Sequence, residues 1–149
     1  MRLREILARK GAEVVCVAPE RTLLEAIAEL NAHKIGAVLV RGDGGIEGIL
    51  TERDVLRCCH HRLAELPTLQ VRDVMTRELV IGRADDSLDY ALGVMTQRRI
   101  RHLPVFDQGQ LAGMVSIGDL VSAQLRDATF EARMMHDYIA GYIPWAQTG

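Results

Sequence analysis

The sequence predicts a mixed α/β (α+β) fold in which two pseudo-symmetric β-α-β-β-α repeats pack sheet to sheet. The first observation is an internal repeat, because a shift of 65 residues places Asp54 on Asp119 and Thr51 on Ser116 without a gap. The second is that each copy runs from a strand through a hydroxyl residue to an aspartate and a helix. The third is size: the 149 residues, of which 48% are hydrophobic, can bury a core, whereas one copy alone has too little apolar surface to do so.

Each copy begins with a short amphipathic lead-in. Residues 3–7 match residues 71–75 at a shift of 68, so the first copy carries three extra residues near Gly11 to Glu13. Runs rich in β-branched residues follow at 13–18 and 78–82, and each leads into an acidic or proline turn. Short runs of this kind are typical of strands, so we expect one strand at each place.

A helix should follow each of these strands. Thr22 and Glu25 have the spacing of a capping box, which marks the start of a helix. Apolar residues then recur at helical spacing in both copies: Leu23, Ile27 and Leu30, and Leu88, Leu92 and Met95. Buried strands are expected at residues 37–40 and 103–106, and a further strand in each copy at 46–50 and 111–115. A final helix after Thr51 or Ser116 completes each unit.

The C-terminal segment is expected to continue the last helix as one amphipathic stripe. Its apolar residues alternate steps of four and three: Val121, Leu125, Ala128, Ala132, Met135 and Ile139. Gly141 and Pro144 should end the helix, and Trp145 follows in a short extension of unknown role. The stripe either covers the protein's own core or packs across a homodimer, and the short remaining chain favours the homodimer. We place the first unit at residues 10–66, the second at 75–131, and the helix end and tail at 132–149.

The two strand-to-helix turns, residues 48–54 and 113–119, are where the sequence points to chemistry. One interpretation is structural, because Ser or Thr at the helix start with an acid three residues later forms a capping box. The other is functional: a helix N-terminus offers free N–H groups and a positive dipole end to a phosphate. An aspartate one turn into the helix can accept hydrogen bonds from both hydroxyls of a ribose.

These features together resemble the CBS-domain family, named after the regulatory domain of cystathionine β-synthase. The resemblance extends from about Lys10 to Arg126 and includes both glycine-to-aspartate turns and the segment at residues 101–105 (RHLPV). It suggests a stand-alone, bacterial-type CBS pair, also called a Bateman module. In that family the cleft between paired repeats binds AMP, ATP, NAD or S-adenosylmethionine, and the turn aspartate holds the ribose.

The resemblance implies two nucleotide sites built from matching positions. Asp54 and Asp119 would hold ribose, while Thr51 and Ser116 would approach phosphate, with Ile117 in the second turn. Each site would also borrow strand residues from the other repeat. The Asp54 site would use Val80, Arg101, His102 and Pro104, and the Asp119 site would use Val15, Ile35, Gly36, Ala37 and Arg53. The copies differ, because Arg53 corresponds to Gly118 and the pair Gly36 and Ala37 corresponds to Arg101 and His102. The positively charged side chain would therefore come from a different position of the repeat in each of the two sites.

Composition argues against several other classes of function. The 18 Lys and Arg residues against 20 Asp and Glu give a net charge of -2, which lacks the basic excess of nucleic-acid-binding proteins. No stretch approaches 18 uncharged apolar residues, so no membrane segment is expected. The three cysteines do not suit a disulfide framework and point to the cytoplasm. The run from Cys58 to His61 suggests zinc, but only Cys58 and His61 share a helix face, so we expect ordinary thiols and no metal.

The sequence thus predicts a non-catalytic regulatory module that binds an adenine nucleotide. AMP or NAD(H) are the first candidates, with ATP or S-adenosylmethionine possible, and neither a catalytic residue nor a catalytic cofactor is expected. A homodimer and an effector protein of unknown identity are the expected partners. The alternative is a structural or interaction dimer without a functional nucleotide site. A nucleotide-hydrolysing enzyme has the least support, because no nucleophile, P-loop or zinc motif is present.

Overall fold

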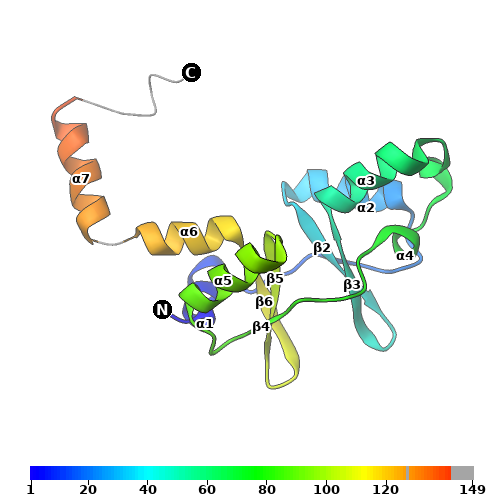
Figure 1. The fold of residues 1–149 in the computed structure, drawn as a ribbon, viewed down its shortest axis with the longest axis horizontal. Coiled ribbons are helices and arrows are strands. Elements are labelled where there is room, and N and C mark those ends of the chain that lie inside the picture. Colours follow the sequence, from blue (N-terminus) through cyan, green and yellow to red (C-terminus); the bar gives the residue numbers. More distant parts are fainter. Residues whose placement is uncertain (127, 142–149) are drawn as a thin grey trace.

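The computed structural model describes residues 1–126 and 128–141 and contains two three-stranded sheets, one per repeat (Figure 1). The strands are β1 (Cys16–Val17), β2 (Ala37–Gly42), β3 (Gly45–Thr51), β4 (Gly82–Arg83), β5 (His102–Asp107) and β6 (Gln110–Ser116). In the first sheet β1 pairs parallel with β2, and β2 pairs antiparallel with β3. The second sheet repeats this order with β4, β5 and β6. The mixed α+β class and its duplication are confirmed.

Apart from the last helix, the helices lie against the two sheets as two separate sets (Figure 1). They are α1 (Leu3–Lys10), α2 (Leu23–His33), α3 (Glu52–Arg62), α4 (Val71–Val74), α5 (Leu88–Arg98), α6 (Ile117–Leu125) and α7 (Ala128–Ile139), with a 3-10 helix η1 (Leu63–Thr68). Hydroxyl side chains begin the paired helices as expected, because Thr22 accepts a hydrogen bond from the Glu25 amide and Ser87 accepts one from the Tyr90 amide. None of the helices within residues 1–126 and 128–141 is both long and apolar enough to cross a membrane.

The two lead-ins are helices, but each one packs on the other repeat. Leu3 and Ile6 of α1 lie in the core of the second unit with Leu88 and Leu103. The Leu88 amide donates to the Met1 carbonyl at 2.9 Å, which fixes the N-terminus against the start of α5.

The second lead-in has the converse position. Val71 of α4 lies in the core of the first unit with Leu23 and Leu30. The Leu23 amide donates to the Leu69 carbonyl at 2.8 Å, and the Val71 amide donates to the Arg21 carbonyl at 2.9 Å. Each unit therefore completes its core with the segment that precedes the other unit.

Two equivalent glycines allow the exchanged segments to lie close to the sheets. Gly48 of β3 pairs with Val40, and Gly113 of β6 pairs with Val105. A Cβ at Gly48 would lie 2.7 Å from the Thr76 carbonyl oxygen, and one at Gly113 would lie 2.7 Å from a methyl carbon of Leu7. A larger residue at Gly48 would displace the backbone of the exchanged segment, and one at Gly113 would force the Leu7 side chain to move.

The two sheets meet through a third, smaller apolar cluster. Ala37, Leu39 and Ile49 of the first sheet are buried there, and Leu111 and Met114 of the second sheet pack against them. Sheet-to-sheet packing of the two repeats is therefore confirmed. Burial of these side chains stabilises the pair by the hydrophobic effect, at roughly 25 cal/mol per Å² of apolar surface.

The first strand of each unit is shorter than expected. Instead of residues 13–18 and 78–82, the ladder covers only Cys16–Val17 and Gly82–Arg83. The reason is that the parallel register joins Cys16 to Leu39 and Gly82 to Val105, and only one further pair forms beyond each. In each copy the preceding residues connect the exchanged lead-in to this strand.

The prediction of one continuous C-terminal helix is wrong. Helix α6 ends at Leu125, because Arg126 has φ −80 and ψ 38, and a separate helix α7 begins at Ala128. Leu125 is 46% exposed and Ile139 is 78% exposed, and α7 extends away from the second unit (Figure 1). The apolar residues therefore do not form one straight stripe. Gly141 follows α7 with φ 78, as a helix end requires, whereas Pro144 and Trp145 lie outside the described residues.

Candidate functional site

The first turn holds Asp54 in a network of neutral donors. Its carboxylate Oδ2 accepts hydrogen bonds from the Thr51 amide at 3.0 Å and from the Thr51 hydroxyl at 3.2 Å. Its Oδ1 accepts one from the Thr76 hydroxyl at 3.1 Å. Asp54 is 8% exposed, and these hydrogen bonds offset the free-energy cost of burying its carboxylate. Thr76 comes from the exchanged segment after α4, and the sequence did not single it out.

The second turn has the same backbone geometry but a charged donor. The Asp119 Oδ2 accepts hydrogen bonds from the Ser116 amide at 2.7 Å and from the Lys10 ammonium at 2.7 Å. The same ammonium donates to the Met114 carbonyl at 2.8 Å. The capping boxes expected at both turns are thus confirmed. Asp119 also forms an ion pair with Lys10, the last residue of α1.

The charge of Asp119 is stabilised in spite of its partial burial. Burial acts to raise the pKa of this carboxyl, but the hydrogen bonds from Lys10 and Ser116 outweigh burial and hold the pKa below its ordinary value. Asp119 is therefore an anion at neutral pH. It can accept hydrogen bonds from hydroxyl groups, which is the property that a ribose-binding residue needs.

His102 and Gly36 bring the two repeats into contact beside these turns. A Cβ on Gly36 would lie 2.9 Å from Cε1 of the His102 ring and 3.5 Å from the Glu52 carboxyl carbon. Only glycine leaves room for the imidazole here. Burial lowers the pKa of His102, while the charges of Glu52 and Asp119 act in the opposite direction. His102 is therefore favoured in its neutral form and is within electrostatic reach of Asp119.

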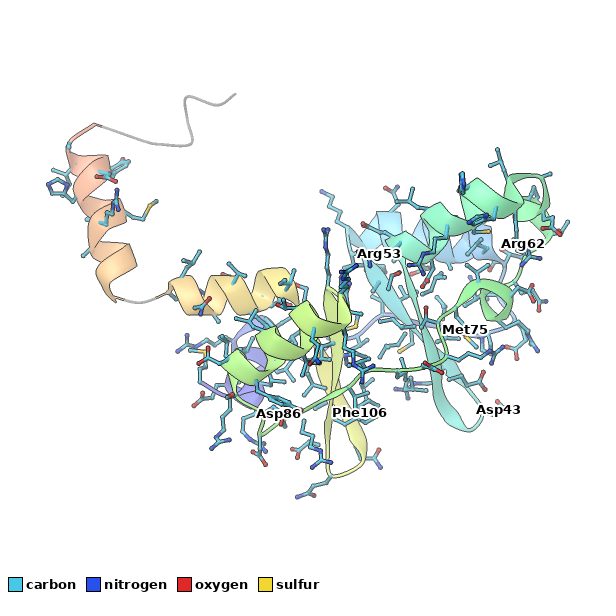
Figure 2. All side chains as sticks on the ribbon, in the orientation of Figure 1. Asp43, Arg53, Arg62, Met75, Asp86 and Phe106 are labelled. Carbon is cyan, nitrogen blue, oxygen red and sulfur yellow. The ribbon has the colours of Figure 1, made fainter. Side chains whose placement is uncertain are left out.

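The two arginines expected at the sites have different surroundings. Arg53 lies at the start of α3, on the side of the first unit that faces the second (Figure 2). Its guanidinium donates to the Arg99 carbonyl at 3.0 Å, and so it ties α3 to the end of α5. Arg101 is exposed at the start of β5, where its carbonyl accepts from the Ile117 amide at 2.8 Å.

The remaining expected residues form the apolar surroundings of the turns. Val15 and Ile35 pack on the core of the first unit, while Val80 and Ile117 pack on the core of the second. Ala37 lies in the cluster between the sheets. Pro104 is buried on β5 opposite Met114. Their division between an Asp54 site and an Asp119 site stays a prediction.

A small cavity opens beside the second turn. It has a volume of about 80 Å³ and is lined by residues of α1 and α6, among them Lys10, Asp119 and Arg126. Ligand sites in proteins usually have about 300 Å³ or more, so a nucleotide would need Lys10 or a neighbouring side chain to move. A larger hollow of about 730 Å³ lies near Asp85 and Phe106, away from both turns.

The cysteine and histidine run of α3 does not assemble a metal site. Cys58 is buried, and burial raises the pKa of its thiol, so it behaves as an apolar core residue. His60 and His61 contact each other edge to face. Within the part of the chain that the structure describes, no group of three or more His, Cys, Asp or Glu side chains is placed to hold a metal ion.

Two residues that contact the turn aspartates, Lys10 and Thr76, were not singled out at the sequence level. Both follow a lead-in, and the one signal near Lys10 was the change of shift from 68 to 65 residues. It did not indicate which repeat each lead-in would reach.

Comparison with known proteins places this duplicated architecture in a family. The family model "CBS domain" matches twice, at residues 3–61 and 71–126. The chain is 39% identical over 115 residues to the CBS domain-containing protein YhcV of Bacillus subtilis (strain 168), covering 76% of this chain and 80% of that relative. A solved CBS-domain containing protein from Agrobacterium tumefaciens is 40% identical with a TM-score of 0.81, covering 83% of this chain and 99% of that one. The structure of CBSX2 in complex with AMP is 25% identical with a TM-score of 0.69, covering 84% and 96%.

Proposed function

The chain belongs to the CBS-domain family, and on that premise we propose that it is a non-catalytic regulatory module that binds an adenine nucleotide between its two repeats. AMP is the first candidate, with NAD(H), ATP and S-adenosylmethionine as further candidates. The observation that carries the proposal is the duplicated turn, in which Asp54 and Asp119 each lie one turn into a helix that begins at a hydroxyl residue. The AMP complex of CBSX2, a relative of the same fold, supports the choice of ligand.

The chemistry of the second turn suits a nucleotide in one orientation. The start of α6 offers backbone N–H groups, the Ser116 hydroxyl and the positive end of the helix dipole to a phosphate. Asp119 offers an ionised carboxylate to ribose hydroxyls. The apolar positions Ile35 and Ala37 would contact the adenine, while backbone groups read its edge. In this arrangement the protein binds the nucleotide without transforming it.

Occupancy would be transmitted through the exchanged lead-ins. Because α1 is packed on the second unit and α4 on the first, a shift of one unit moves a segment of the core of the other. We also propose a homodimer, because Leu125, Met135 and Ile139 expose apolar side chains. An effector protein would read the resulting change. The free thiols of Cys16, Cys58 and Cys59 suit a reducing compartment such as the cytoplasm.

A structural or interaction dimer without a nucleotide site is the second candidate function. It is favoured by one observation: both aspartates already have protein donors, and the cavity beside Asp119 has only about 80 Å³. In that case the two turns would serve only to start their helices.

Calorimetric titration with AMP, NADH, ATP and S-adenosylmethionine separates the two functions, with thermal unfolding as a second readout. We expect saturable binding of at least one nucleotide and a rise in Tm with its concentration. A protein that gives neither binding heat nor a Tm shift with any of the four would leave the dimer function as the better account.

A further inference from the structure

We infer that Lys10 determines the specificity of the Asp119 site: it competes with ribose for the Asp119 carboxylate and, once displaced, pairs with the phosphate of the bound nucleotide. The site would therefore select phosphorylated ligands over nucleosides. This inference rests on the proposed function and adds to it a residue and a selection rule.

The first support is the position of the Lys10 ammonium. It lies 2.7 Å from Asp119 Oδ2, and that oxygen lies 2.7 Å from the Ser116 amide at the start of α6. The ammonium is therefore placed beside the helix end that would hold the phosphate. Lys10 and Asp119 also line the same cavity of about 80 Å³, so the ion pair occupies part of the space that a ligand would need.

The second support is the geometry of the carboxylate. Asp119 Oδ2 already accepts two donors, whereas Oδ1 accepts no hydrogen bond from the residues that the structure describes. A ribose has two adjacent hydroxyls, and one can reach Oδ1. The second needs Oδ2, which is available only if Lys10 leaves. An ammonium without a counter-ion is unfavourable at a partly buried site, and a nucleotide phosphate supplies one whereas a nucleoside does not.

The third support is the contrast with the first turn. There the oxygen that corresponds to the one Lys10 contacts, Asp54 Oδ2, accepts hydrogen bonds from the Thr51 amide and hydroxyl. The Thr76 hydroxyl donates to the other oxygen, Oδ1, so every donor at the first turn is neutral. The charge at the second turn is thus an added feature and not a requirement of the fold. The Lys10 side chain is 35% exposed, so its ammonium can leave Asp119 toward solvent or toward a bound phosphate.

The test is the ratio of adenosine Kd to AMP Kd, measured by calorimetry at low salt on the full chain. Five proteins are compared: wild type, Lys10→Met, Lys10→Gln, Lys10→Arg and the control Arg41→Met. Arg41 is an exposed cation of β2 that does not line the cavity beside Asp119, so its removal changes the net charge equally at a distance from the proposed site. Lys10→Gln serves as a second neutral variant, and urea unfolding checks that each protein is folded.

We expect wild type to bind AMP more tightly than adenosine, and Lys10→Met to narrow the ratio about tenfold, with adenosine binding tighter and AMP weaker. Lys10→Arg and Arg41→Met should keep the wild-type ratio. A ratio that is unchanged in both neutral variants, while wild type still binds AMP, overturns the role of Lys10 and leaves the proposed function intact. If no protein of the set binds AMP or adenosine, this inference is wrong, and the proposed function is wrong as well if NADH, ATP and S-adenosylmethionine also fail to bind wild type.

Discussion

Replacement of Asp119 by asparagine tests the ribose assignment most directly. The amide keeps the size of the side chain and one acceptor for the Ser116 amide, but it removes the negative charge and the second acceptor. A hydrogen bond to a charged group contributes about 1.5–3 kcal/mol, so the Kd for AMP should rise about 10- to 150-fold. The ion pair with Lys10 is partly exposed, with side-chain exposures of 35% and 26%, so its loss should lower the free energy of unfolding by only about 1 kcal/mol.

The comparison needs a control for the capping role of the carboxylate. Asp73 has the same capping position in α4, where it accepts from the Gln70 amide at 2.9 Å, and it is not part of either proposed site. Asp73→Asn should therefore lower stability by a similar amount and leave the AMP affinity unchanged. Calorimetry gives the affinity and urea unfolding gives the stability of each variant. The ribose assignment would be refuted by an unchanged Kd in Asp119→Asn, in Asp54→Asn and in the double variant.

Three further predictions test the fold, the pH response and the dimer. Leu3→Ala should lower the free energy of unfolding by about 3 kcal/mol, because Leu3 is 0% exposed in the second unit's core; a loss no larger than that of the exposed control Leu24→Ala would contradict the lead-in exchange. Burial lowers the pKa of His102 below its ordinary 6.5, so protonation favours the unfolded state. The free energy of unfolding of wild type, measured by urea titration, should thus fall as the pH is lowered from about 7 to below 6.5. The fall should be smaller for His102→Gln, and an equal pH dependence of the two proteins would contradict this account. Light scattering should find a dimer for the full chain and a monomer for Leu125→Glu with Met135→Glu, whereas a monomeric wild type would disprove the dimer.

The elements that could be predicted from the sequence are those encoded by neighbouring residues. The helix starts at Thr51 and Ser116 were visible because a capping box is complete within four residues. Those at Thr22 and Ser87 were visible because a hydroxyl residue precedes apolar residues at helical spacing. The hairpin strands were visible because a buried strand shows as an apolar run before a turn. Their duplication at a shift of 65 residues strengthened each assignment.

Prediction from the sequence was wrong where a local pattern is compatible with two different structures. The apolar residues from Val121 to Ile139 fit one long helix, yet α6 ends at Leu125 and α7 begins at Ala128. Periodicity reports which residues are apolar but not whether the axis bends at Arg126. The first strands were overestimated for a similar reason, because residues 13–18 have the composition of a strand but only two of them have a ladder partner.

The sequence by itself determined that the chain has two like units, and that each presents a carboxylate at the start of a helix, because both properties depend on residues close together in the chain. Only the tertiary structure decided which segment completes which unit. The choice of the second unit by α1 brings Lys10 to Asp119, a contact that spans 109 positions of the chain. No periodicity reaches that far: the pairing follows from the close approach of α1 to β6 at Gly113 and from the burial of Leu3 against Leu88 and Leu103.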